Sequence, residues 1–303
     1  GGVVGYGYYA DLTNVTNRAN VTVKTTTGNA EYTGGLAGRL VQGKLVNCTN
    51  EGNISGVRSV GGLAGASGND IPITNCSNHG SIYASTTRVG GICGSMMRSV
   101  MTNCYNTGSI TSGSTAASAS YAGGIAGEVT TKPTFSNCFN VGKVTAKVNG
   151  AALFGYVNTI TTVDHLYYLE GTAEIVNYGS SAYAGKIEAT KMTADEMADT
   201  MFVVDLNDNS GETEALFGTG ESWPMFIREG GQKLAMEAGD INGDGQIDKA
   251  DADALYVIVK TKTTDDLTVI QLRIMDLNED GKVDSKDVSL LYAYAAGKIS
   301  SFH

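Results

Sequence analysis

The chain has 303 residues, of which 42% are hydrophobic, with 40 glycines, 3 prolines and a net charge of −10 at pH 7. This length allows two or three domains with cores of their own, and no apolar run approaches the roughly 18 residues of a membrane span. Residues 1–176 hold ten Lys and Arg against eight Asp and Glu, while residues 177–303 hold eleven against 23. Because this charge distribution offers no basic face, we expect no nucleic-acid partner, and because no apolar run is long enough, we expect no membrane span.

A glycine-rich box recurs in the first part of the chain. The copies read GGLAG, GGLAG, GGICG and GGIAG, followed by a degenerate GAALFG, and they begin at Gly34, Gly61, Gly90, Gly123 and Gly150. Successive copies start 27, 29, 33 and 27 residues apart, and GGVVGYG at the start is a candidate further copy. A repeat of this length predicts a solenoid in which each coil stacks on the next.

A second box follows each glycine box. It reads LVNCTNEGNIS, ITNCSNHGSIY, MTNCYNTGSIT and FSNCFNVGKVT, and LTNVTNRANVT from Leu12 fits the same frame. Each copy alternates apolar and polar residues and then turns at a polar segment, mostly Asn-x-Gly, which is typical of strands. We therefore predict a mainly β fold over residues 1–176, a parallel β-solenoid (β-helix) of about 27–33-residue repeats.

The cysteines distinguish two interpretations of the second box. Four of them share one repeat position: Cys48, Cys76, Cys104 and Cys138. Val15 occupies that position in the first copy, so it accepts a small hydrophobic residue, and Cys93 stands where other copies have alanine. We favour a ladder of reduced, buried cysteines, with disulfides of a secreted protein as the alternative.

The GGLAG-type box resembles the GLUG motif of bacterial surface and secreted proteins. The resemblance implies an extracellular repeat region of adhesin-like or substrate-contacting character, and it implies no reaction. The eight carboxylates of residues 1–176 are scattered along the coils, and no catalytic pair can be built from the sequence. His79 aligns with unrelated residue types, and we expect it to be an exposed turn residue. Several tyrosines could form a sugar-contacting face or pack at strand ends.

Residues 177–235 have a different pattern. TADEMADTMFVVDLN, residues 193–207, predicts one helix, with Thr193 and Glu196 as a capping box and an apolar stripe behind it. Trp223, the single tryptophan, lies in ESWPMFIREGG. We predict a small helical cap over the end of the solenoid, with sugar stacking by Trp223 as the alternative.

Residues 236–303 contain one acidic pattern twice, DINGDGQIDKAD from Asp240 and DLNEDGKVDSKD from Asp276. Oxygen-bearing side chains at loop positions 1, 3, 5, 9 and 12, with glycine at position 6, are the spacing that wraps a chain around calcium. The expected ligands to two Ca²⁺ are Asp240, Asn242, Asp244, Asp248, Asp251 and the Gln246 carbonyl, and Asp276, Asn278, Asp280, Asp284, Asp287 and the Lys282 carbonyl. Each loop precedes one helix, in an all-α domain.

This duplicated loop-helix, with Asp instead of Glu at position 12, resembles a type I dockerin. The resemblance implies a partner, the cohesin domain of a scaffoldin or of a cell-surface anchor protein. It also implies contacts through loop positions 10 and 11 and the exposed face of each helix, here Lys249, Ala250, Tyr256 and Val257, and Ser285, Lys286, Tyr292 and Ala293. Because the two pairs at positions 10 and 11 differ, we expect one preferred binding orientation.

These features together predict a non-catalytic protein that its calcium-dependent dockerin joins to a cellulosome-like or cell-surface complex. The solenoid would act as adhesin, spacer or contact for a plant or host glycan. The alternative is a polysaccharide-degrading enzyme of a cellulosome, a glycosidase or a lyase, because dockerins are usually attached to such enzymes. We expect a secreted, extracellular or surface-associated bacterial protein, and we interpret the opening GGVVGYGYY as the start of a processed or truncated fragment.

Overall fold

The structure is a computed structural model that describes residues 1–24, 31–114, 120–160, 162–234, 237–261 and 274–302. The chain divides into two compact units, which we call the repeat unit (Gly1–Thr193) and the C-terminal unit (Ala194–His303). The domain boundary expected at residues 235 and 236 lies outside the described residues. In the described part of the chain, no helix has the length and apolar character needed to cross a membrane.

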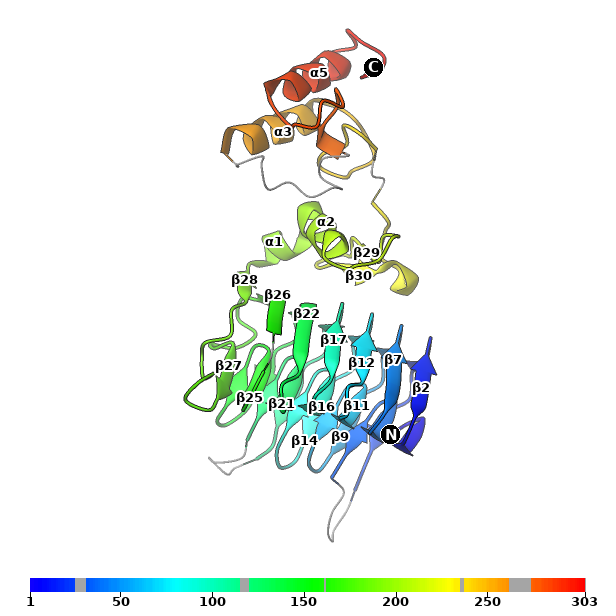
Figure 1. Ribbon diagram of the computed structural model, residues 1–303, viewed down its shortest axis with the longest axis vertical. Coiled ribbons are helices and arrows are strands. Elements are labelled where there is room, and N and C mark those ends of the chain that lie inside the picture. Colours follow the sequence, from blue (N-terminus) through cyan, green and yellow to red (C-terminus); the bar gives the residue numbers. More distant parts are fainter. Residues whose placement is uncertain (25–30, 115–119, 161, 235–236, 262–273, 303) are drawn as a thin grey trace. The chain divides into compact units, whose positions relative to one another are not determined.

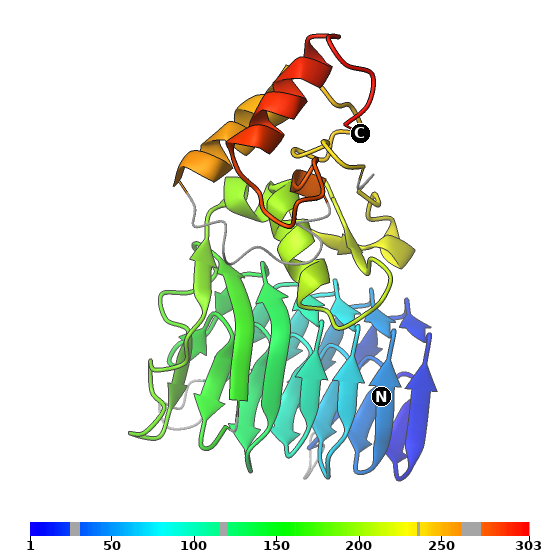
Figure 2. The ribbon, with the colours of Figure 1, turned by 45° about the horizontal axis from the view of Figure 1, so that its top comes forward.

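The repeat unit consists of short strands, each paired in parallel with the equivalent strand of the next repeat (Figures 1 and 2). One sheet contains, in order, β1 (Val4–Gly7), β6 (Ala37–Leu40), β11 (Ala64–Ser67), β16 (Cys93–Met97), β21 (Ala126–Thr130), β25 (Phe154–Val157) and β27 (Asn177–Gly179). The glycine boxes begin in a second sheet, with the order β5 (Thr33–Gly34), β10 (Val60–Gly61), β15 (Val89–Gly90), β20 (Ala122–Gly123) and β24 (Gly150–Ala151).

The second boxes supply two further sheets. One contains β2 (Ala10–Thr13), β7 (Gly43–Val46), β12 (Pro72–Thr74), β17 (Val100–Thr102), β22 (Thr134–Asn140), β18 (Tyr105–Asn106), β13 (Ser77–Asn78), β8 (Thr49–Asn50) and β3 (Thr16–Asn17), and β26 (Thr162–Leu169) joins it between β22 and β28 (Thr190–Met192). The other contains β4 (Val21–Thr22), β9 (Ile54–Gly56), β14 (Ile82–Ala84), β19 (Ile110–Ser112) and β23 (Val144–Thr145).

The register of the strands confirms the repeat alignment made from the sequence. The third residue after each opening glycine of a box is paired with its counterpart in the next: Ala37, Ala64, Cys93 and Ala126. Val4 pairs with Ala37, so GGVVGYG is a further copy of the glycine box. Parallel pairing also continues beyond residue 176, since β27 pairs with β25 and β28 with β26. The unit is therefore mainly β, with parallel strands in stacked sheets.

The interior is filled by ladders of equivalent residues. The apolar residue of the glycine box is fully buried in every copy from the second onward: Leu36, Leu63, Ile92, Ile125 and Leu153. All five cysteines are buried, which confirms the expectation that these positions hold small interior residues. Cys138 pairs with Leu166, so the last repeat again has an apolar residue at this position.

Glycine is required where the backbone of the box folds closely onto itself and onto the next coil. A Cβ added to Gly61 would lie 2.1 Å from the carbonyl oxygen of Ala64 and 2.7 Å from the amide nitrogen of Gly94. A Cβ on Gly90 would lie 2.1 Å from the carbonyl oxygen of Cys93. Real side chains do not tolerate such distances, so the box keeps glycine for close packing of the backbone.

The C-terminal unit contains helices and one short hairpin. Its elements are α1 (Ala194–Ala198), α2 (Thr200–Asp208), β29 (Phe217–Gly218) antiparallel to β30 (Met225–Phe226), the 3₁₀ helix η1 (Ile227–Glu229), α3 (Lys249–Thr261) and α5 (Ser285–Ala295). The prediction of one helix over residues 193–207 was wrong. The helix is interrupted at Asp199, whose carboxylate caps α2 by accepting a hydrogen bond of 2.8 Å from the Met201 amide.

Helices α3 and α5 pack against each other, with Leu255 and Leu291 fully buried between them. Met201 of α2 packs against the same core. The Thr200 hydroxyl donates a hydrogen bond of 2.7 Å to the carbonyl oxygen of Asn242. Of the segment predicted as a cap, residues 194–234 are therefore joined to the acidic loops within one compact unit, whereas residues 177–193 belong to the repeat unit. Trp223 is half-buried.

Candidate functional site

The two acidic loops are folded by similar hydrogen bonds, from the amides of positions 4 and 6 in the first loop and of positions 5 and 6 in the second. At position 1, Asp240 accepts hydrogen bonds from the amides of Gly243 and Gly245 at 2.8 and 2.9 Å. Its counterpart Asp276 accepts from Asp280 and Gly281 at 3.1 and 2.8 Å. The loop thereby wraps around the position-1 carboxylate.

Position 12 connects each loop with the helix that follows. Asp251 accepts hydrogen bonds from the amides of Ile241, Asn242 and Asp248 at 2.8, 3.1 and 2.8 Å. Asp287 does the same with the amides of Leu277, Asn278 and Asp284 at 2.9, 3.2 and 2.8 Å, and it forms a capping box with Asp284 at the start of α5. Both carboxylates are 0% exposed. The aspartate at position 12 thus fixes the loop and stabilises the first turn of the helix.

The backbone has the turn that a calcium loop needs at position 6. Gly245 and Gly281 both have φ of 81°, in the left-handed region that glycine favours. Position 4 is left-handed too, with Gly243 at 74° and Glu279 at 55°. The second loop therefore places a glutamate in a conformation that costs a non-glycine residue energy.

The donor atoms in both loops are the hard oxygens that calcium prefers. Burial raises the pKa of Asp240 above its usual value, the amides of Gly245 and Gly243 lower it, and the nearby charges of Asp251 and Asp244 raise it again. A divalent cation would relieve this crowding of negative charge, so the residues fit calcium chemically. No group of three or more Asp, Glu, His or Cys side chains is gathered as a metal site in the described residues. The loop carboxylates are instead held by backbone amides.

The residues expected to contact a cohesin lie differently in the two copies. Lys249, Ala250, Tyr256, Val257, Ser285 and Lys286 are exposed, whereas Tyr292 and Ala293 are half-buried. Tyr256 and Val257 of α3 are 46% and 54% exposed. The Tyr292 hydroxyl instead donates a hydrogen bond to Asp253 of α3, the residue that also pairs with Lys249 at 2.6 Å. Lys249 is thus joined to both helices.

Lys286 has another role. Its ammonium group lies 2.9 Å from a carboxylate oxygen of Asp280, the expected position-5 ligand of its own loop. The pKa of Asp280 is lowered and that of Lys286 is raised, in both cases chiefly by this hydrogen bond. In the second loop, one expected calcium ligand, Asp280, is therefore paired with a lysine.

The sequence interpretation missed one feature of the repeat unit and was wrong about another. The second asparagine of each second box forms a buried ladder, in which each side-chain amide donates to the next: Asn17, Asn50, Asn78, Asn106 and Asn140, at 2.6–2.7 Å. Its signal was the asparagine at the same place in all five copies. The expectation that His79 is exposed was wrong, because its ring is half-buried beside Tyr105 and bonds to the Thr107 hydroxyl at 2.9 Å.

Comparison with protein families finds the dockerin type I domain at residues 238–294 and the GLUG motif at residues 29–55 and 85–111. No curated protein matches the sequence. One similar solved structure is that of a "putative immunoglobulin A1 protease" from Bacteroides ovatus, with 20% identity and a TM-score of 0.42, over 74% of this chain and 70% of that chain. A likeness this distant carries no argument.

Type I dockerin domains bind calcium and dock onto cohesin domains, and the proteins that contain them are typically extracellular or cell-surface proteins of bacteria. The twin loops and paired helices described above coincide with the matched residues. The chain therefore contains a type I dockerin domain at residues 238–294, preceded by a region with GLUG motifs.

Proposed function

We propose that this protein is a non-catalytic component of a cohesin-bearing complex, cellulosome-like or on the cell surface, and that its dockerin attaches it there. The observation that carries the proposal is the duplicated loop-helix, in which two buried aspartates fix two equivalent loops. It is supported by the exposed Tyr256 and Val257, an apolar contact surface on α3.

The dockerin would hold two Ca²⁺, one in each loop. The proposed ligands are those expected from the spacing, Asp240, Asn242, Asp244, Gln246, Asp248 and Asp251, and Asp276, Asn278, Asp280, Lys282, Asp284 and Asp287. Gln246 and Lys282 would use their carbonyl oxygens. Calcium would bind the oxygens of these carboxylates and would take the place of the Lys286 ammonium group beside Asp280, and folding would be linked to metal binding.

The region before the dockerin would act outside the cell. We infer a parallel β-solenoid that covers residues 1–176 and continues through β27 and β28 to Thr193, a small helical region over the rest of residues 177–235 and a dockerin over residues 236–303, in a secreted or surface-associated bacterial protein. The stacked coils would serve as adhesin, spacer or glycan contact. Parallel pairing in register, with continuous ladders inside, supports the solenoid.

Calcium removal tests the docking mechanism. A panel of type I cohesin domains is screened by calorimetry against the full chain, first in calcium and then in EDTA. We expect binding in calcium to be lost in EDTA, and thermal unfolding of the C-terminal unit to shift while that of the repeat unit stays in place. Cohesin binding that survives EDTA would refute the mechanism.

Charge reversal tests the expected contact residues. Lys249→Glu with Lys286→Glu should weaken the cohesin complex at least about tenfold, because rim charges contribute to complementarity. Circular dichroism in calcium should stay unchanged. An unaltered affinity would show that recognition uses other residues.

A further inference from the structure

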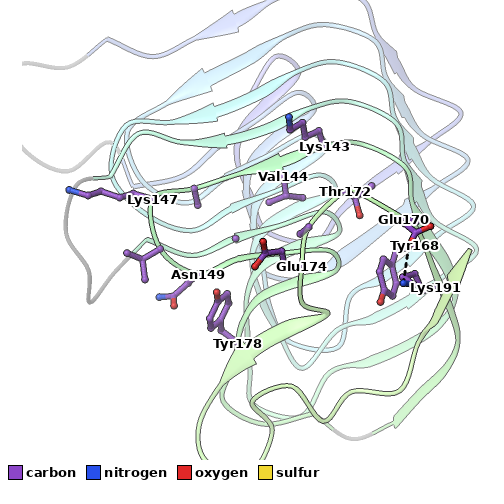
Figure 3. Close-up of a pocket in the computed structure, with 15 residues that line it drawn as sticks. Lys143, Val144, Lys147, Asn149, Tyr168, Glu170, Thr172, Glu174, Tyr178 and Lys191 are labelled. Atoms are coloured by element: carbon purple, nitrogen blue, oxygen red, sulfur yellow. Dashed lines mark hydrogen bonds and ion pairs between the residues drawn. The ribbon is translucent and has the colours of Figure 1, made fainter. Parts of the chain in front are cut away.

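The repeat unit contains a pocket of about 630 Å³ beside its last coils (Figure 3). Pockets for small ligands typically have volumes of roughly 300–1,000 Å³. All of its lining residues lie between Lys143 and Lys191, so the pocket belongs to the repeat unit alone. Neither the GLUG motif nor the dockerin covers any of these residues.

The pocket exists because the sheets end at different coils. Strands β23 and β24 are the last of their sheets, whereas the other two sheets continue through β27 and β28. Residues 170–176 pass over β23 and β24 as irregular chain, attached by the hydrogen bond of 3.0 Å from the Val144 amide to the Thr172 carbonyl oxygen. A full coil would have covered this surface with another rung.

The lining combines apolar, aromatic and polar groups. Val144, Ala146 and Ala173 supply aliphatic surface, and Tyr168 and Tyr178 supply rings. The polar groups are Asn149, Thr172 and Glu174, together with Glu170 and Lys191. Such a mixture suits a ligand that is itself apolar on one face and rich in hydroxyls at its edge.

The lining has three lysines, Lys143, Lys147 and Lys191, and two glutamates, Glu170 and Glu174, so its charges nearly cancel. The Lys191 ammonium group lies 2.9 Å from a carboxylate oxygen of Glu170, so this pair is neutral overall. Glu174 forms no ion pair with another described residue, and it projects toward the middle of the pocket, between Tyr178 and Asn149 on one side and Tyr168 on the other (Figure 3). Lys147 extends away from the pocket. The central polar group is therefore a hydrogen-bond acceptor with negative charge.

We propose that this pocket binds one neutral sugar residue of an oligosaccharide. The aliphatic C–H face of the ring packs on Tyr178 and on the floor around Val144 and Ala173, and the ring hydroxyls donate to Glu174 and bond with the Asn149 amide. An apolar ligand would leave the Glu174 carboxylate desolvated without a donor, and the nearly cancelling charges of the lining favour a neutral ligand over a charged one. The inference rests on the proposed glycan contact and assigns that contact to named residues.

The first experiment identifies a ligand with the full chain in calcium. An array of neutral cello-, xylo-, manno- and galacto-oligosaccharides and of uronic-acid oligosaccharides is screened, and hits are measured by calorimetry. We expect binding of at least one neutral series. Binding of uronic-acid series alone, or of none, would overturn the proposal.

Substitutions then locate the site. Tyr178→Ala and Glu174→Gln should each weaken binding of the neutral hit about tenfold, because each removes one aromatic or charged contact. Tyr83→Ala is the matched control, since Tyr83 is an exposed tyrosine on β14, outside the pocket, and should leave affinity unchanged. Equal losses in all three variants, or loss in the control alone, would contradict the assignment.

Cohesin binding by the same variants separates this inference from the docking function. All three variants should bind the cohesin like the unaltered chain, because their substitutions lie in the repeat unit. Loss of sugar binding with intact cohesin binding is the expected result. A chain that binds cohesin and no sugar would refute the pocket and leave the docking proposal standing.

Discussion

The two copies of the loop-helix agree in their buried residues and differ at their surface. Asp251 and Asp287 each accept three backbone hydrogen bonds and are fully buried. At position 10 of the first loop, however, Lys249 pairs with Asp253 on its own helix, whereas Lys286, at position 11 of the second loop, pairs with the loop carboxylate Asp280. The duplication has thus kept the groups that build the loop, while the groups that face solvent have diverged.

This difference separates the parts of the dockerin by role. Residues that every calcium loop needs cannot change without leaving amides unpaired in the interior. Surface residues are under no such constraint, and here they give α3 an exposed apolar pair, Tyr256 and Val257, while Tyr292 of α5 bonds to Asp253. The comparison favours one docking orientation, led by α3, and four experiments can break or sharpen it.

The largest expected effect is at position 12. Asp251→Ala and Asp287→Ala should each destabilise the C-terminal unit by about 3 kcal/mol, because each leaves three amides without an acceptor and removes a helix cap. Chemical denaturation of each variant in EDTA measures the loss without the contribution of calcium. A difference of more than about twofold between the two losses would show that the copies are not equivalent in their interiors.

The next effect concerns the exposed face. Tyr256→Ala should weaken cohesin binding by about tenfold or more, as loss of an exposed aromatic anchor does. Tyr292→Phe removes only the hydroxyl that bonds to Asp253, and calorimetry should show a change of less than about threefold. If Tyr292→Phe costs more affinity than Tyr256→Ala, then α5 leads the contact and the preferred orientation is reversed.

A smaller effect is expected on calcium affinity. Lys286→Ala should raise the calcium affinity of the second loop, because Lys286 competes with the cation for Asp280. The increase should be only about threefold, because an exposed ion pair is weak. Lys249→Ala is the matched control, since Lys249 pairs with Asp253, which is no proposed ligand, and the first loop should bind as before. Calcium titration followed by NMR of the loop glycines distinguishes the two loops. An unchanged second loop would mean that Lys286 does not compete.

The smallest effect is at position 4. Glu279→Gly should stabilise the C-terminal unit by about 0.5 kcal/mol, since the relief of a left-handed glutamate at 55° outweighs the freedom that glycine adds to the unfolded chain. Gly243→Ala should have the opposite sign, because Gly243 is left-handed and a Cβ there would lie 3.1 Å from Leu234. Thermal unfolding of both variants measures the two changes in the stability of the C-terminal unit. A stabilised Gly243→Ala would contradict this account of the turn.

Much of the repeat unit could be predicted from the sequence because each repeat obeys the same local rules. The boxes fixed which residues stack, and the strand register follows them from Ala37 to Ala126. The valine in place of a cysteine indicated a buried apolar ladder, which the buried cysteines confirm. The asparagine ladder was overlooked because a polar residue next to a turn is usually read as solvent-exposed, although here each amide satisfies the next in the interior.

Other features could not be read from local pattern. The continuous apolar stripe led us to expect one helix where the chain forms α1 and α2. The stripe does not show that the Asp199 side chain caps a new helix in its middle. The position of these helices beside the acidic loops depends on contacts such as that from Thr200 to Asn242. A periodicity in sequence contains no information about such a meeting of separate segments.

The sequence by itself determined the repeat length, the residues inside the stacked coils and the positions of the oxygen-bearing side chains in the two acidic loops. These depend on neighbouring residues and on equivalent positions of adjacent repeats, so a pattern is enough to define them. Tertiary structure alone decided that Asp253 joins Lys249 to Tyr292, 39 residues further along the chain than Asp253, and that two sheets end early enough to leave a pocket. Both arise from how whole elements pack, where the free energy depends on surfaces brought together from distant parts of the chain.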